Sequence, residues 1–454
     1  MTVEKISIDN QPRLLLIFAG WGMDAGMFRT LERGGYDIAV VHSYHTHGSM
    51  PQWIDGYREI CVLAWSYGVS MAERVLLEHP AWPVTLRVAV NGTPMPVSDD
   101  YGIPGRIYRA TLEGLSERSV YKFYRRMCVD GEQFSRWKEQ MPQRSLDSLM
   151  VELELFGNLT PIEPQRWDIA YVGLHDAIIP PDNQRRAWHR LADLRELDCG
   201  HLPDFQKLID SLLIDKNDVA RKFSSHADTY CENAIVQRTV CGHVDTALRR
   251  IVPPTVDSMV EVGAGGGLLT RLYSSWLRPR RLELWDISVI DPQLPGEHCR
   301  CDAETAVSQL ENVDVIVSSA TIQWMNNPRQ FVARCAAALA PGGVAVISTF
   351  GPDTFREILS MLPNSLRYLS ADEWRGLQLP ADCTLAVEER VERLEFASSR
   401  DLLRHISLTG VNGCGTPAVA SQRACRAILQ SGVTSLTYHC IYLIIKNICP
   451  SKII

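Results

Sequence analysis

The stretch from Met259 to Thr270, Met-Val-Glu-Val-Gly-Ala-Gly-Gly-Gly-Leu-Leu-Thr, decides how the rest of the chain is interpreted. A short apolar run reaches Glu261 and then opens into glycines at 263, 265, 266 and 267. This order is typical of a buried parallel strand that turns tightly into a helix. Because glycine has no Cβ, the backbone N–H groups of such a turn can approach a ligand closely. The stretch therefore predicts a ligand-binding loop, with a glycine-rich helix cap as the alternative.

Two cofactor classes use such a turn, and the spacing of the glycines separates them. A dinucleotide fingerprint, G-x-G-x-x-G, counted from Gly263 would need a third glycine where Leu268 stands. The spacing that is present, from Glu261 through Gly263 and Gly265 to Gly267, resembles the S-adenosylmethionine loop of class I methyltransferases. The resemblance implies S-adenosylmethionine as the cofactor of this half of the chain.

The following segments support this interpretation. A second apolar strand, Leu282 to Trp285, ends in Asp286, at the spacing where an acid can take both ribose hydroxyls of the cofactor. Further on, Val313 to Ser319 indicates a fourth strand. Leu339 to Gly343 reads as the turn before a fifth strand, Val344 to Thr349. Before that fourth strand, Cys301-Asp302-Ala303-Glu304 follows a third short segment. In the methyltransferase family an acid at this place lies beside the adenine amine, so the resemblance gives that role to Asp302.

Length and composition bound the remaining possibilities. A chain of 454 residues suggests two or three domains of roughly 150 residues. The net charge of −7 gives no general attraction for nucleic acid, which is bound through excess Lys and Arg. No apolar run reaches the roughly 18 residues that a membrane span requires, and Met1 to Arg13 lacks the features of a signal peptide. We expect a soluble, cytoplasmic protein that binds neither nucleic acid nor membrane.

Cysteine and histidine give no sign of a metal site. The thirteen cysteines are scattered and form no C-x-x-C, so neither a disulfide framework nor a zinc site is indicated. His42, His45 and His47 lie close together but lack accompanying Cys or acidic ligands at metal spacing. We predict reduced thiols and no bound metal.

The amino-terminal half contains a second motif of chemical interest. In the segment from Arg13 to Ala19, the continuous apolar run Leu-Leu-Leu-Ile-Phe-Ala predicts a central strand buried on both faces. A second run, Ile60 to Ala64, leads through Trp65-Ser66-Tyr67-Gly68 into a helical stretch, Val69 to Glu78. This is the strand, serine turn and helix of the α/β-hydrolase nucleophile elbow, with Ala64 in place of the first glycine of G-x-S-x-G. Alone the motif is weak, because a serine in such a turn is more often a plain helix cap.

Two later segments supply the partners that this serine needs. Trp167 to Gly173 predicts a strand that runs into Asp176, and Leu194 to Leu197 predicts one that runs into Asp198 and His201. Ser, Asp and His follow in the chain order of α/β-hydrolases. A serine hydroxyl becomes a good nucleophile when an imidazole takes its proton and a carboxylate orients that imidazole. We predict Ser66 as nucleophile, His201 as base and Asp176 as orienting acid. Asp198 is the competing acid, and satisfied loop residues are the alternative.

The oxyanion donors and a lid complete this site. The backbone N–H groups of Tyr67, directly after the serine, and of Trp21, after the first strand, are in the positions that this fold uses. Tyr101 to Arg166 predicts helices inserted over the active site. Within this lid six cations recur at near-helical spacing and would form a basic face, either for an acidic partner or merely solvated: Arg106, Arg109, Arg118, Lys122, Arg125 and Arg126.

The boundary between the halves lies at Ile214 to Asn217. The sequence therefore predicts an α/β-hydrolase domain at 1–215 with its lid at about 101–166. A class I, Rossmann-like methyltransferase domain follows at 216–454. Near its end we expect a charged strand pair at Thr384 to Phe396 and a closing antiparallel strand at Leu436 to Ile445.

Both halves resemble known enzymes of biotin synthesis. The carboxyl half is similar to malonyl-[acyl carrier protein] O-methyltransferases, except that Ala264-Gly265-Gly266-Gly267 stands where that family more often has Cys-Gly-Thr-Gly. The amino half is similar to pimeloyl-[acyl carrier protein] methyl ester esterases. The matching residues of the carboxyl half are Arg221-Lys222-Phe223-Ser224, Thr229-Tyr230, the glycine loop, Cys301 to Glu304, Ser319 to Trp324, Ser348 to Gly351, Thr409-Gly410-Val411-Asn412 and Leu436-Thr437-Tyr438. Those of the amino half are Phe18 to Gly22 and Ala64 to Gly68.

The resemblance implies one enzyme with two activities. The carboxyl half would methylate the free carboxylate of malonyl-[acyl carrier protein] with S-adenosylmethionine, and the amino half would hydrolyse the methyl ester of pimeloyl-[acyl carrier protein]. Acyl carrier protein is then the partner of both. The alternative is a methyltransferase of other small-acid specificity with a hydrolase-like domain that serves only for docking.

Overall fold

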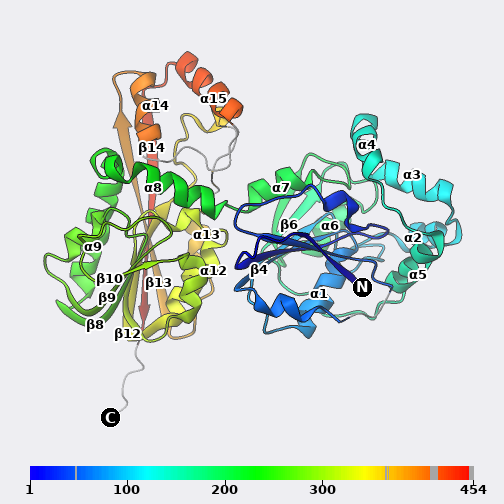
Figure 1. Cartoon of the computed structure of the whole chain (residues 1–454), viewed down its shortest axis with the longest axis horizontal. Coiled ribbons are helices and arrows are strands. Elements are labelled where there is room, and N and C mark those ends of the chain that lie inside the picture. Colours follow the sequence, from blue (N-terminus) through cyan, green and yellow to red (C-terminus); the bar gives the residue numbers. More distant parts are fainter. Residues whose placement is uncertain (46–48, 363–365, 367, 409–417, 449–454) are drawn as a thin grey trace, which may run out of the picture. The chain divides into compact units, whose positions relative to one another are not determined.

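The computed structural model covers the whole chain and divides it into two compact units, Met1–Leu212 and Leu213–Ile454 (Figure 1). It describes all residues except 46–48, 363–365, 367, 409–417 and 449–454, and not the side chains of 226–233 and 418–421. His47 and the motif Thr409 to Asn412 therefore lie outside the described residues, as do the side chains of Thr229 and Tyr230. No described helix is long and apolar enough to cross a membrane.

The first unit is built on a seven-stranded sheet with the order β1-β3-β2-β4-β5-β6-β7. Only the edge strand β1 runs antiparallel to its neighbour, β3. The central strands β2 and β4 are buried along their whole length, because helices cover both faces of a parallel sheet. The strands are β1 (Thr2–Ser7), β2 (Arg13–Phe18), β3 (Asp37–His42), β4 (Glu59–Trp65), β5 (Val84–Val90), β6 (Ile169–Gly173) and β7 (Asp193–Leu197).

The helices of the first unit fall into two groups. One group follows the strands of the sheet: α1 (Gly68–Glu78), α6 (Pro181–Trp188) and α7 (Phe205–Leu212), with the 3-10 turns η1 (Ala25–Phe28) and η2 (Gln52–Gly56). The other is inserted between β5 and β6 and corresponds to the predicted lid: α2 (Gly105–Glu113), α3 (Glu117–Met127), α4 (Gly131–Trp137), η3 (Lys138–Gln140) and α5 (Leu146–Gly157). Figure 1 shows these inserted helices, in cyan and blue-green, gathered together beside the sheet.

The second unit contains another seven-stranded sheet, with the order β10-β9-β8-β11-β12-β14-β13. Strand β14 runs antiparallel to both of its neighbours, as predicted for the closing strand. The α/β class and the two folds predicted from the sequence are therefore confirmed. The strands are β8 (Thr255–Val262), β9 (Arg278–Asp286), β10 (Glu297–Arg300), β11 (Val313–Ser318), β12 (Leu339–Phe350), β13 (Cys383–Glu395) and β14 (Ser435–Asn447).

Two predictions about these strands were wrong. The charged segment near Thr384 to Phe396 forms one 13-residue strand, β13, and no strand pair. It pairs with β14 over its whole length, and half-buried and exposed side chains alternate along it except at four successive exposed residues in its middle. The expected turn Leu339 to Gly343 lies within β12, where the pairing with β11 shifts register and Gly342 takes a φ of +81°.

Helices cover both faces of this second sheet. Successive residues of β11 belong to different cores: Val315 and Val317 pack into one, and Ile316 packs into the other. Both faces are apolar because β11 lies in the middle of the sheet. The helices are α8 (Lys216–Asn233), α9 (Ile235–Ile251), α10 (Leu268–Tyr273), α11 (Ala303–Ala306), α12 (Pro328–Ala338), α13 (Ala371–Arg375), α14 (Ser399–Leu408) and α15 (Ala418–Ser431), with the 3-10 turns η4 (Val307–Gln309), η5 (Ile322–Trp324) and η6 (Leu359–Met361).

Candidate functional sites

Ser66 stands at the apex of the turn between β4 and α1. Its backbone has a φ of +58°, a left-handed conformation that is strained for a residue other than glycine. Two glycines make room for the turn: a Cβ on Gly68 would lie 2.3 Å from the carbonyl oxygen of Phe18, and one on Gly92 would lie 2.3 Å from that of Ser66. Ala64 is fully buried within an unbroken β4, so the sheet accommodates its methyl group.

The structure brings Ser66, His201 and Asp176 together. His201 Nε2 lies 2.9 Å from Ser66 Oγ, and His201 Nδ1 lies 2.9 Å from Asp176 Oδ2. All three residues are buried, with exposed fractions of 4%, 0% and 6% for Ser66, His201 and Asp176. The other carboxylate oxygen of Asp176 accepts the N–H groups of Ile178 and Ile179, at 2.8 and 3.0 Å. The acid is thereby fixed, and through it the orientation of the imidazole.

The competing acid lies elsewhere. The side chain of Asp198 is 87% exposed and pairs with His175 at 2.9 Å, so it does not contact His201. Sequence reasoning did not find Gln184, whose side-chain amide donates to Asp176 Oδ2 at 2.8 Å. Gln184 lies one helical turn into α6, and only the folded structure shows that it faces the acid.

The two predicted oxyanion donors lie in the turns that follow β2 and β4. Within the described part of the chain, the backbone N–H groups of Trp21 and Tyr67 donate to no other group. The turn of Trp21 passes close to the serine, since a Cβ on Gly20 would lie 3.1 Å from Ser66 Cβ. Both N–H groups therefore lie in turns close to Ser66 and have no partner among the described residues, as an oxyanion donor requires.

The six predicted cations of the lid lie on α2 and α3 or at their ends. All six side chains are exposed, and none forms an ion pair with a described residue. On the inner side of α3, the Phe123 ring packs edge-on against Trp21 with a centroid distance of 4.9 Å. At its end, the Met127 carbonyl accepts the N–H of Leu202, next to His201. The four cations on α3 thus belong to a helix that contacts both the turn of Trp21 and the loop of His201.

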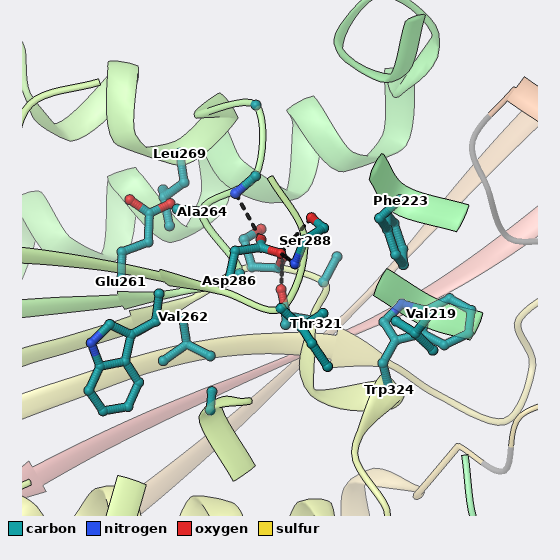
Figure 2. Close-up of a pocket in the computed structure, with 18 of the residues that line it drawn as sticks. Val219, Phe223, Glu261, Val262, Ala264, Leu269, Asp286, Ser288, Thr321 and Trp324 are labelled. Atoms are coloured by element: carbon teal, nitrogen blue, oxygen red, sulfur yellow. Dashed lines mark hydrogen bonds between the residues drawn. The ribbon is translucent and has the colours of Figure 1, made fainter. Parts of the chain in front are cut away.

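In the second unit, the glycine loop joins β8 to α10. Gly263, Gly265 and Gly267 all have positive φ values, of +80°, +44° and +75°. A Cβ on Gly263 would lie 2.0 Å from Thr321 Oγ1, and one on Gly267 would lie 2.4 Å from Leu294. The every-second-residue glycine pattern thus follows from backbone conformation and close packing together. The loop lines a pocket at the end of the sheet (Figure 2).

The acid at the end of β9, Asp286, closes one side of this pocket. Asp286 Oδ2 accepts the N–H of Gly265 at 2.9 Å, and Oδ1 accepts both the N–H and the hydroxyl of Ser288, at 2.7 and 2.6 Å. Burial raises the pKa of Asp286, while these donors oppose the shift. Figure 2 shows Asp286 and Ser288 side by side in the middle of the pocket.

Glu261 joins the strand to the helix beyond the loop. It is 2% exposed and accepts hydrogen bonds from the hydroxyls of Thr270, at 2.7 Å, and Tyr273, at 2.6 Å. Burial raises the pKa of Glu261 to about 7, although both hydroxyls favour the ionised form. Its carboxyl group therefore holds α10 against β8 at the edge of the pocket.

Asp302 belongs to a cluster of charges that the sequence did not reveal. It caps α11 by accepting the N–H of Glu304 at 3.0 Å. The ammonium group of Lys216, which is 3% exposed, lies 2.8 Å from Glu304 Oε2 and 3.6 Å from Asp302 Oδ1. Burial works against ionisation of Glu304, but the charge of Lys216 prevails and lowers its pKa. Lys216 comes from the start of α8, far from the acids in sequence.

The remaining wall comes from α8 and α9. Val219 and Phe223 line it together with Trp324, and the rings of Phe223 and Trp324 meet edge-on at 5.6 Å (Figure 2). Gln237 also lines the pocket, is 4% exposed, and its Oε1 has no hydrogen-bond partner among the described residues. A buried polar atom of this kind is normally satisfied, so it favours a polar ligand in the pocket. Sequence reasoning missed Lys216 and Gln237 as lining residues, because they lie in α8 and α9, before β8, the first strand of the second unit.

No metal centre is visible in the described part of the chain. Groups of three or more His, Cys, Asp or Glu residues placed to hold a metal ion do not occur there. His42 instead bonds Ser43 and Glu4, each at 2.9 Å.

Comparisons with known proteins match the two units separately and together. Residues 1–209 match the family described as pimeloyl-ACP methyl esterase BioG, and residues 233–408 match a methyltransferase domain family. A malonyl-[acyl-carrier protein] O-methyltransferase of Bacteroides fragilis (strain 638R) is 31% identical over 460 residues, covering 95% of this chain and 92% of its own. One of Acinetobacter baylyi is 31% identical over 255 residues, 52% of this chain and 98% of its own. The crystal structure of BioG from Haemophilus influenzae is 31% identical, covers 44% of this chain and 94% of its own, and has a TM-score of 0.41.

The methyltransferase family and the pocket agree on the small molecule of the second unit. The glycine loop, the acids Asp286 and Asp302, the apolar wall and the unsatisfied Gln237 fit a nucleoside that carries an amino acid tail. S-adenosylmethionine is therefore the co-substrate of this unit.

Gly265→Val should abolish S-adenosylmethionine binding. The main cause is the left-handed φ of +44°, which strains a β-branched residue. A steric clash is not the cause, because a Cβ at this position would meet only Asp286 Oδ2, at 3.5 Å. Calorimetric titration of the full chain should show at least about a 100-fold loss of affinity. Gly376→Ala, at the end of α13, should bind as the wild type does. Unchanged binding by the valine variant would remove the loop from the site.

Glu261 should titrate near pH 7 in the absence of ligand. Because its folded pKa lies above its unfolded value, the stability that its protonated form contributes is fully present below about pH 4.5 and is lost as the pH rises through about 7. An infrared carbonyl band of a protonated carboxylic acid should disappear with a midpoint near 7. Glu261→Gln should lack this band. A midpoint below pH 5 would show that burial does not control this group.

Proposed function

Because the chain belongs to the malonyl-[acyl-carrier protein] O-methyltransferase family, we propose that its second unit methylates the free carboxylate of malonyl-[acyl carrier protein] in biotin synthesis. We propose further that the first unit is a serine esterase that hydrolyses the methyl ester of pimeloyl-[acyl carrier protein]. The full-length relative from Bacteroides fragilis supports the first activity. The match of residues 1–209 to the BioG family supports the second.

The methylation requires few protein groups. S-adenosylmethionine supplies a methyl group on a positively charged sulfur. The accepting carboxylate is already ionised at neutral pH, since carboxylic acids titrate near 4, so no general base is needed. The protein's contribution is to align the two reactants and to exclude water. In this proposal Gly263 and Gly265 approach the amino acid part with their backbone, Asp286 holds the ribose, and Asp302 lies beside the adenine. Gly267, also predicted to bind the cofactor, does not line the pocket and instead lets the loop pack against Leu294.

The single observation that carries the esterase proposal is the buried chain of hydrogen bonds from Asp176 through His201 to Ser66. In this arrangement His201 Nε2 takes the proton of Ser66 as Oγ attacks the ester carbonyl. The carbonyl oxygen becomes an oxyanion that the N–H groups of Trp21 and Tyr67 can bind. His201 then returns the proton to the leaving methoxide, so methanol departs. Water repeats the cycle on the acyl-serine and releases the free acid.

An alternative is that the first unit only docks the carrier, and that the second unit is a methyltransferase with a different small-acid specificity. The strained φ of +58° at Ser66 speaks against this, because such strain is typically retained where the side chain must be presented for chemistry. The basic face of α2 and α3 is compatible with both readings, since an acidic carrier would dock there in either case.

Ser66→Ala should separate the two activities. Hydrolysis of methyl pimeloyl-carrier should fall by at least about 10³-fold, because the nucleophile is gone. Methyl transfer to malonyl-carrier should stay within twofold of the wild type, and Gly265→Val should show the reverse pattern. Both rates are measured on the same protein preparation by mass spectrometry of the carrier. Full hydrolysis by Ser66→Ala would exclude the serine mechanism, and no hydrolysis by the wild type would favour the docking alternative.

Charge reversal of the basic face should weaken carrier docking. Lys122 and Arg125 are the best targets, since Arg126 also donates to the carbonyl of Ala177, next to Asp176. The double change to Glu should raise KM for the carrier-linked ester about 10-fold or more and reduce its salt dependence. Hydrolysis of a small free methyl ester should not change.

The matched control reverses two exposed cations of the first unit outside the lid, Arg58 and Lys207, and so has the same net charge. It should keep the wild-type KM. Equal losses for the carrier-linked and free esters, or equal effects of the two double variants, would contradict docking on α2 and α3.

A further inference from the structure

Lid helix α5 contacts both residues that carry the predicted oxyanion donors. The indole N–H of Trp21 donates to the carbonyl of Leu149 at 3.0 Å. The ring of Tyr67 stacks on Phe156, with a centroid distance of 4.2 Å and an interplanar angle of 7°. The side chains of the two donor residues, which come from different strands, are thus held by one inserted helix.

A buried carboxylate of α5 holds the oxyanion turn by its backbone. Glu152 has no exposed surface; its Oε2 accepts the N–H of Gly22 at 3.3 Å, and its Oε1 accepts the N–H of Tyr44 at 3.0 Å. The hydroxyl of Tyr44 in turn donates to the carbonyl of Ala19 at 2.7 Å. Glu152 therefore fixes the backbone directly after Trp21 and, through Tyr44, the backbone before it.

An arginine of the lid pairs with this buried carboxylate. Arg144 donates to Glu152 Oε2 and to the carbonyl of Met23, both at 2.9 Å. An unpaired charge in this position would be costly to bury. It would also repel a negative charge forming on the nearby ester oxygen. The guanidinium offsets both effects while adding a further contact to the same turn.

A second lid helix holds the turn from its other side. The hydroxyl of Tyr124, on α3, donates to the carbonyl of Gly22 at 3.1 Å. Gly22 has a φ of +74°, and a Cβ there would lie 3.0 Å from Leu149. Both peptide groups of Gly22 are therefore fixed by the lid, Glu152 binding its N–H and Tyr124 its carbonyl.

We infer that the lid is a structural part of the oxyanion hole, with Glu152, Arg144 and Tyr124 as positioning residues for the Trp21 N–H. This inference rests on the proposed esterase function of the first unit. A donor lowers the barrier when it is already aimed at the place where negative charge develops. Hydrolysis then proceeds only while α5 occupies the position seen here. The lid sets the rate of the chemical step as well as covering the acyl chain.

Glu152→Gln in the full chain tests the inference. An amide presents only one acceptor oxygen, so the N–H of Gly22 or of Tyr44 loses its partner. We expect kcat to fall about 10- to 100-fold, with KM within threefold of the wild type. The loss should be the same for the carrier-linked ester and a small free methyl ester, because both use one hole. Glu154→Gln, on the exposed side of the same helix, should behave as the wild type.

An alkyl trifluoromethyl ketone gives a readout that a merely structural role would not move. Ser66 Oγ adds to its carbonyl carbon, the serine proton passes to His201, and the former carbonyl oxygen becomes an oxyanion in the hole. Inhibition of Glu152→Gln by the ketone should weaken by the same factor as kcat/KM. Tyr124→Phe removes one hydroxyl only and should lower kcat about threefold to tenfold in the same way, so it decides the matter if Glu152→Gln does not fold.

Wild-type kcat in Glu152→Gln or, failing that, in Tyr124→Phe would overturn the inference. A raised KM with unchanged inhibition by the ketone would also overturn it, since the lid would then act on substrate binding alone. These outcomes presuppose an active wild type. Absence of ester hydrolysis by the wild-type chain would instead be a failure of the proposed function.

Discussion

Each unit depends on a parallel strand that must turn into a helix within a few residues, with its backbone in the left-handed region. In the second unit glycines make this turn without strain, because they have no Cβ. In the first unit Ser66 makes it with a side chain, and the strain is tolerated because Gly68 and Gly92 let the neighbouring backbones close around it. In the proposed function this difference follows the chemistry: the glycine loop offers its backbone to a ligand, and the turn of Ser66 offers a nucleophile.

Buried acids are treated differently in the two sites. Asp176 is surrounded by donors, namely two backbone N–H groups, an amide and the imidazole, which fix both of its carboxyl oxygens. In the second unit, burial raises the pKa of both Glu261 and Asp286. A ligand with positive charge compensates such acids better than a neutral one does. This matches a co-substrate that carries a sulfonium and an ammonium group.

Local sequence patterns were sufficient to predict a feature where a single short segment determines it. The glycine loop, the elbow of Ser66, and the strand ends before Asp176 and His201 all lie within a few residues of the strands that position them. The sequence favoured Asp176 over Asp198 because its strand end leads into a proline-bounded loop, and Asp176 is the acid whose Oδ2 lies 2.9 Å from His201 Nδ1.

The features that the sequence did not predict depend on contacts between distant residues. Glu152 and Gly22 are 130 positions apart, and Lys216 and Glu304 are 88 apart. No local pattern distinguishes these buried charges from solvated ones. Strand β13 was misread for a related reason: its run of Glu and Arg breaks the apolar alternation, and only the long pairing with β14 makes it one strand.

In the proposed function one chain both adds and removes a methyl ester. The first unit must therefore not hydrolyse the methyl malonyl group that the second unit forms. The two acyl groups differ by four methylenes, and burial of about 0.8 kcal/mol for each gives roughly 3 kcal/mol, or on the order of 10² in kcat/KM. The most direct measurement is hydrolysis of both methyl esters on the same carrier by one enzyme preparation. We predict a preference of about 10² or more for methyl pimeloyl-carrier. Values within threefold of each other, or hydrolysis of neither ester, would contradict the account.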